Sequence, residues 1–214
     1  MGSSSSEPYV KRVIQSILLS AVVAASARGG LVGTRHDFTG PGTGWNKSGE
    51  RCRPCHTPHH AVSPQIIPLW NHQTTMATFT LYASATFNGA PSIGQPGGVS
   101  LACLSCHDGT VALENYSGRT NGTVHIYHSN LGTDLRRDHP IWFTYDTVLA
   151  AADGRLHDPA VQPSGLGGTI AEDLLINGRI ECTSCHDPHG GAGVRPLLVK
   201  SNAASSLCLT CHRK

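Results

Sequence analysis

All eight cysteines of the chain occur in CxxCH units, at residues 52–56, 103–107, 182–186 and 208–212. Two cysteines separated by two residues and followed directly by histidine form the attachment site of c-type haem. The thiols bind the porphyrin covalently, and the histidine ligates the iron. The sequence therefore predicts four haem c groups. Their covalent attachment residues are Cys52, Cys55, Cys103, Cys106, Cys182, Cys185, Cys208 and Cys211, and their first axial ligands are His56, His107, His186 and His212.

Three other uses of paired cysteines explain this pattern less well. Disulfide bonds suit an exported chain, but they give no reason for a histidine after each pair. Structural zinc sites use paired CxxC motifs, and the interval from Cys185 to Cys208 is near that of a zinc ribbon. The interval from Cys55 to Cys103 is too long for such a site. Thioredoxin-like redox motifs do not occur four to a chain, so the histidines favour haem.

The other histidines are the predicted source of a second axial ligand. Thirteen histidines are present, and nine remain when four have completed CxxCH units. Only two methionines occur, Met1 and Met76, which nearly excludes methionine as a ligand. Haems with two histidine ligands mainly pass electrons, whereas an open iron position permits ligand binding or catalysis. We therefore predict an electron carrier and not an enzyme.

The chain repeats one order of motifs. The first half reads RHDF, CRPCHTPHH and CLSCHDG, and the second reads DHPIWF, CTSCHDPHG and CLTCH. Each half holds an isolated histidine beside aspartate, a CxxCHxPH unit and a simple CxxCH unit. This predicts two similar haem pairs, at about residues 28–125 and 126–214.

The repeat suggests which histidines are the second ligands. A histidine three residues after a CxxCH histidine cannot easily reach the opposite face of the same ring, so we assign His59 to the second haem and His189 to the fourth. His36 and His139 would then serve the first and third haems, or equivalent sites across an interface. The remaining histidines divide into two alternatives, His60 and His72, and three expected to face solvent, His125, His128 and His157.

The composition predicts little regular structure. The chain contains 24 glycines and 13 prolines, and only 6% of its residues are aromatic. Four porphyrins can supply an apolar core that the chain need only wrap. We therefore predict a mostly irregular, coil fold with short α-helices wrapped around four haems and little or no sheet. SSLCLTCH, with a serine N-cap, and DTVLAAAD, ended by Asp153 and Gly154, are the helix candidates.

The N-terminal residues have the features of a secretion signal. Lys11 and Arg12 precede the apolar run VIQSILLSAVVAASA, whose small residues at its end fit a cleavage site after Ala27. A short buried or amphipathic helix is the alternative. We predict a signal over residues 1–27, a mature domain of residues 28–214, and a cell-surface or extracellular location, with the periplasm as the alternative. The formal net charge of +2 does not indicate binding to nucleic acid.

The arrangement of CxxCHxPH followed by a second CxxCH, with HDF, PLWNH, CLSCHDGTVA and DHPIWF, resembles the doubled-CxxCH multihaem cytochromes c of metal-reducing bacteria and archaea. The similarity covers most of residues 35–212. Four-haem members of this size include extracellular cytochromes that polymerise into conductive filaments. The resemblance implies a homopolymer that exchanges electrons with redox proteins or extracellular acceptors. A soluble periplasmic shuttle is the first alternative, and a multihaem reductase is a more remote one.

A shared ligand would join such copies head to tail. After cleavage at Ala27, His36 would lie near the new N-terminus, and the last CxxCH unit ends at His212, close to Lys214. His36 either completes the first haem of its own chain or ligates a terminal haem of the next copy. In the second case the contact is heterologous, and without ring closure it builds a filament.

Overall fold

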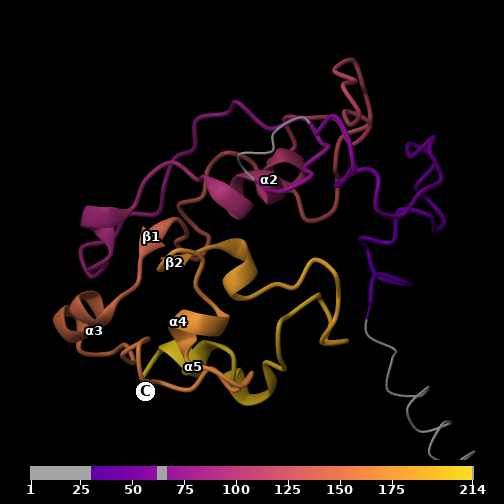
Figure 1. The fold of residues 1–214 in the computed structure, drawn as a ribbon. Helices are drawn as coiled ribbons and strands as arrows, with labels where there is room; N and C mark the ends of the chain where they lie inside the picture. The colour runs from indigo at the N-terminus through magenta and orange to yellow at the C-terminus, as the bar shows by residue number, and fades with distance from the viewer. Residues whose placement is uncertain (1–29, 62–66, 214) are drawn as a thin grey trace, which may run out of the picture.

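The computed structural model describes residues 30–61 and 67–213. Turns and irregular segments make up most of this chain, with a few short helices between them (Figure 1). The secretion signal predicted for residues 1–27 lies outside the described residues. Within the described ranges, no helix has the length and apolar character needed to cross a membrane.

The helices and strands are all short. Their order and bounds are η1 (Ala90–Ser92), α2 (Gly98–His107), β1 (Phe143–Thr144), α3 (Thr147–Asp153), α4 (Ile170–Asp173), β2 (Arg179–Ile180), η2 (Cys182–Ser184), η3 (Ala203–Ser205) and α5 (Cys208–Cys211). Strands β1 and β2 pair antiparallel, with Phe143 opposite Ile180. The described chain is thus mostly coil with short helices and one small sheet, and its wrapping around four haems stays a prediction.

Local capping residues set the bounds of two helices. The Asp146 side chain accepts the backbone N–H of Leu149 at 2.8 Å and so starts α3. Gly154 ends this helix with a left-handed φ of 70°, which glycine adopts without steric cost. Helix α4 begins with a capping box between Thr169 and Glu172. These signals lie within a few residues of each helix, so sequence alone specifies them.

The predicted serine cap of the last helix is wrong. Leu207 occupies the N-cap of α5, and no side chain caps this helix. The nearby hydroxyl of Ser206 instead donates to the carbonyl of Ser201 at 2.6 Å. The serine is therefore used in the preceding turn, whose backbone lies close enough to compete for it.

The apolar core lies in two clusters. The larger one gathers residues of β1, α3, α4 and β2 together with neighbours in sequence: Phe143, Tyr145, Leu149, Ala150, Ile170, Leu174, Leu175 and Ile180. The smaller one joins Phe79 and Leu135 to Leu104 of α2. Neither includes a residue from the N-terminal described segment, which Figure 1 shows, in indigo, on the far side of the molecule from α3.

Polar contacts hold this N-terminal segment in place. The amide nitrogen of Asn46 donates to the carbonyls of Phe38 and Glu50, at 2.9 and 3.0 Å. Its amide oxygen accepts the hydroxyl of the buried Tyr116 at 2.8 Å. Because Asn46 is itself buried, each of these bonds satisfies a group that would be costly to leave unpaired. The segment that carries His36 is therefore fixed mainly by hydrogen bonds.

Candidate functional site

The first CxxCHxPH unit is pinned by the chain that follows it. The backbone N–H of Thr57 donates to the carbonyl of Leu69, and that of Asn71 donates to the carbonyl of Cys55, both at 2.9 Å. The Asn71 side chain also donates to the carbonyl of Arg53 at 2.6 Å. The unit is thus held by the segment of the PLWNH motif.

The second CxxCHxPH unit has the same backbone pattern. The N–H of Asp187 donates to the carbonyl of Leu197 at 2.7 Å, and that of Val199 donates to the carbonyl of Cys185 at 3.0 Å. Leu197 and its counterpart Leu69 both have positive φ, 58° and 64°. Each motif therefore builds the same local turn, as a repeat of sequence should.

The simple CxxCH units lie on helices. Residues 103–107 form the last part of α2, and Cys208–Cys211 form α5. In the three units outside α2, the histidine N–H donates to the carbonyl of the first cysteine, at 2.8 to 3.0 Å. One helical turn therefore sets the relative positions of cysteines and histidine in each unit, whatever the surrounding structure.

Three pairs of imidazoles lie at a common distance. Each pair joins one CxxCH histidine to one histidine outside these units, with ring centres 6.0, 6.1 and 6.2 Å apart: His56 with His189, His36 with His107, and His139 with His212. A metal–imidazole bond is about 2.0 Å long, so two imidazoles on opposite sides of one metal ion have centres roughly 6 Å apart. The observed pairs fit this requirement.

Backbone carbonyls orient these rings. The Nδ1 atoms of four histidines lie 2.9 to 3.3 Å from a carbonyl oxygen: His36 from Pro188, His107 from Ser129, His139 from Pro140, and His186 from Pro196. Metal-binding histidines commonly donate the N–H of their second ring nitrogen in this way. With the proton on Nδ1, Nε2 is left as the ligand atom. The donor set therefore fits haem iron.

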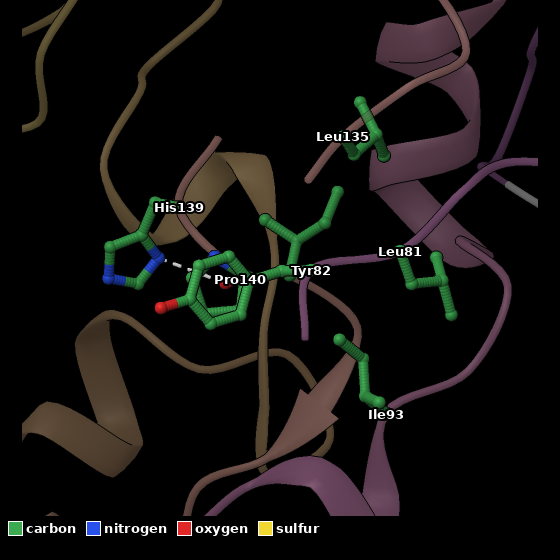
Figure 2. A pocket seen from close by; sticks show the side chains of 7 residues that line it. Leu81, Tyr82, Ile93, Leu135, His139 and Pro140 are labelled. Atoms are coloured by element: carbon green, nitrogen blue, oxygen red, sulfur yellow. Dashed lines mark hydrogen bonds between the residues drawn. The ribbon is translucent and has the colours of Figure 1, made fainter. Parts of the chain in front are cut away.

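His139 lies at the edge of an apolar pocket. Figure 2 shows its Nδ1 directed to the Pro140 carbonyl, with Leu81, Tyr82, Ile93 and Leu135 around the same space. Ile141 also lines this pocket. A porphyrin is largely apolar, so this lining suits one of its faces or edges. The sequence did not single out Leu81, Tyr82, Ile93 and Leu135, because these residues come from three separate segments of the chain.

The observed pairs differ from those that the repeat predicted. His36 lies opposite His107 of the second unit and not opposite the first, and His189 lies opposite His56 of the first unit and not the fourth. His139 lies opposite His212 of the fourth unit, where the third was expected. Two pairs, His36 with His107 and His139 with His212, stay within one half but join the isolated histidine to the simple CxxCH unit, and only His189 crosses to the other half.

Two contacts bring the halves together at this point. The backbone N–H of Gly30 donates to the carbonyl of Gly190 at 3.0 Å, and Nδ1 of His36 lies 3.3 Å from the Pro188 carbonyl. The sequence could not reveal either contact, because both join residues more than a hundred positions apart. That each paired imidazole binds iron stays a prediction.

His59, the ligand predicted for the second haem, is not placed near His107. Its side chain is exposed, and its carbonyl accepts the hydroxyl of Thr57 at 2.8 Å. The alternative His60 is also exposed and has a left-handed φ of 58°. The structure therefore brings neither histidine to the site for which the sequence proposed it.

His72, the other alternative, is almost fully buried, with 2% of its surface exposed. Its Nδ1 lies 2.9 Å from the Gln73 carbonyl, and its Nε2 lies 3.7 Å from Sγ of Cys106. Trp70 lies beside it, with ring centres 6.4 Å from His72 and 6.3 Å from His56. His72 is thus beside an attachment cysteine and is not opposite a CxxCH histidine.

His186 of the third unit differs from the other CxxCH histidines. In the part of the chain that the structure describes, no imidazole forms a comparable ring pair with it. It lies near enough to His36 to contribute to the lowered pKa of that imidazole, after burial and the closer His107 and His189. A neutral imidazole is the form that binds metal, so a lowered pKa favours ligation.

Cysteines of neighbouring units lie near enough to affect one another's pKa. Cys55 raises the pKa of Cys106, Cys182 raises that of Cys103, and Cys208 raises that of Cys185. The attachment units therefore follow one another in space in the order of the sequence.

Burial also governs the chemistry of the unreacted thiols. It raises the pKa of Cys55 to about 12, and it is the main cause of the raised pKa of Cys106. All eight thiols are free of disulfide bonds. Within residues 30–61 and 67–213, no three histidine, cysteine or acidic side chains gather as a metal cluster.

One family model matches part of the chain. Residues 176–214, which hold the third and fourth units, match the family model for the doubled CXXCH motif. The match supports a multihaem c-type cytochrome. Its motifs bind haem c covalently, and such a cytochrome carries electrons. A search of curated proteins finds no match to the chain.

Proposed function

We propose that this protein is a tetrahaem c-type cytochrome that passes electrons along closely spaced haems with two histidine ligands. The observation that carries the proposal is the set of three imidazole pairs, each of which contains one CxxCH histidine. Bound haem iron supplies one-electron redox chemistry. The order of the attachment units gives the order of the sites along the path.

The chain supports electron transfer by holding its ligands still. Hydrogen bonds to backbone carbonyls fix the rings of His36, His107 and His139, so the same two imidazoles remain in place in both oxidation states. Where two of these imidazoles hold one haem iron, they would also keep small molecules from the metal. Both effects favour electron transfer over catalysis.

We extend the proposal to export and assembly into an extracellular filament, as the family resemblance implies. Because His36 faces His107 of its own chain, we now assign the shared ligand to a different site. An imidazole from a second copy would complete the site of His186. His125 and His128 are exposed and supply suitable donors.

A second candidate function is favoured by the same feature of His186. If no second copy supplies a ligand, this site would bind a small molecule, as a ligand-binding haem does. Carbon monoxide added to the reduced protein distinguishes the two. Binding to dilute monomers but not to filaments is expected for a ligand shared between copies, whereas binding in both favours the second candidate.

The count and the ligation are tested directly. Intact-mass measurement of the secreted protein is expected to show four haem additions, and electron paramagnetic resonance is expected to show low-spin ferric iron. Fewer than four additions would contradict the tetrahaem proposal. Electron microscopy of extracellular material then tests for filaments, and their absence would favour the soluble shuttle.

A further inference from the structure

A buried carboxylate joins the second and third attachment units. Glu181 directly precedes Cys182 and is only 2% exposed. Its Oε2 accepts the backbone N–H of Ser100, in the first turn of α2, at 2.8 Å. Its backbone binds η2, since the Glu181 carbonyl accepts the N–H of Ser184 at 2.9 Å and the Glu181 N–H donates to the Ser184 hydroxyl at 3.0 Å. Glu181 therefore binds the helix that carries Cys103 through its carboxylate and the turn that carries Cys182 through its backbone.

Ser100 makes the connection reciprocal. Its side chain is fully buried, and its hydroxyl oxygen accepts the backbone N–H of Cys182 at 3.1 Å. Buried polar groups are costly to leave without partners, so these bonds hold the two units in one relative position.

Glycine permits the close approach of the carboxylate. Gly98, the first residue of α2, has a left-handed φ of 50°, and a Cβ there would lie 3.0 and 3.1 Å from the two carboxylate oxygens of Glu181. The ring of Trp142 encloses the same place, at 2.9 Å from that Cβ position. The N-terminus of a helix also favours negative charge. The junction is thus shaped around a carboxylate.

We infer that Glu181 is a positioning residue for electron transfer between the second and third haems, an inference that rests on the proposed function. It fixes the separation of their attachment units at the point where the two halves of the sequence meet. Its negative charge stabilises the more positive, ferric state of the iron, so it lowers the reduction potentials of these two haems.

Replacing Glu181 separates its charge from its position. Glu181→Gln keeps an oxygen that accepts N–H bonds but removes the charge. In the complete secreted protein, we expect two of the four midpoint potentials to rise in a spectroelectrochemical titration, with all haems still low-spin. Glu172→Gln is the matched control, because Glu172 also caps a helix but is exposed, and it should shift none.

Glu181→Ala removes the position as well. After flash reduction, electron equilibration within the protein should slow in Glu181→Ala and stay near the wild-type rate in Glu181→Gln. If the alanine variant does not fold, Ser100→Ala breaks the same junction from α2 and should also slow equilibration. Unchanged potentials in Glu181→Gln with four haems attached would overturn the inference, whereas fewer than four haems in the wild type would overturn the proposed function.

Discussion

The two CxxCHxPH units share a backbone pattern, but only one delivers its last histidine to a neighbouring site. His189 faces His56 with ring centres 6.0 Å apart, while His59 is exposed. The next residue is Gly190 in one unit and His60 in the other, so its type differs. Its backbone conformation does not, because both residues have positive φ, 69° and 58°. A repeated motif therefore specifies its own turn without specifying the partner of that turn.

The residue after the motif explains much of this difference. The Gly190 carbonyl accepts the N–H of Gly30, and a Cβ at position 190 would lie 3.0 Å from the Gly30 carbonyl oxygen. Glycine thus allows the N-terminal segment to dock on the second unit. His60 carries a side chain at the equivalent position of the first unit.

The largest expected effect, on the spin state of the haem iron, comes from replacing the last histidine of a CxxCHxPH unit. His189→Ala should convert the first haem to high spin and shift its potential, because its ring lies opposite His56. His59→Ala should leave the visible and electron paramagnetic resonance spectra as they are. A high-spin signal in His59→Ala with none in His189→Ala would reverse this comparison.

Substitution of the following residue should have the next largest effect. Gly190→Ala places a Cβ at a left-handed φ and against the Gly30 carbonyl, so we expect a loss of about 1–3 kcal/mol in the free energy of unfolding. His60→Gly is the control, which relieves strain in the first unit and should cost little. Denaturant unfolding measures both, and equal losses would show that docking on Gly190 is unimportant.

Asp187 should have a smaller effect of the same kind. Its carboxylate accepts the N–H groups of His189 and Gly191, at 2.9 and 2.5 Å, and so holds the turn in place. Asp187→Ala is expected to cost about 1–2 kcal/mol of unfolding free energy. Thr57→Ala, in the first unit, removes a single hydroxyl bond to His59 and should cost less. The opposite order of stabilities would argue against a special role for the second turn.

The smallest expected effect is on the stability of the folded protein at low pH. The Arg51 guanidinium, 2.7 Å away, is the main cause that holds the pKa of Asp37 well below its ordinary value of 3.8. Because the folded pKa is lowered, this contribution to stability is present above pH 3.8 and is lost as the pH falls toward the folded value. Asp37→Asn should flatten the acid limb of the stability profile, and high salt should weaken the pair. An unchanged acid limb would show that the pair contributes nothing.

Local features of the structure follow the sequence closely. The helix of DTVLAAAD is capped by Asp146 and ended by Gly154, as its letters indicate. The distal pairs do not follow, because His36 and His139 lie beside the other unit of their own half and His189 lies beside a unit of the other half. No sequence motif pointed to the junction of Glu181, Ser100 and Trp142. Gly97 and Gly98 alone mark a place where other groups can approach the backbone closely.

The sequence by itself determined the chemistry of this protein and its local turns. Four CxxCH units define where haem c attaches, because two thiols and one imidazole must lie within a single helical turn. Only the tertiary structure decided which imidazole lies opposite which unit and which units are neighbours. Those choices depend on contacts such as Gly30 with Gly190 and Glu181 with Ser100, which join distant segments and have no periodicity along the chain.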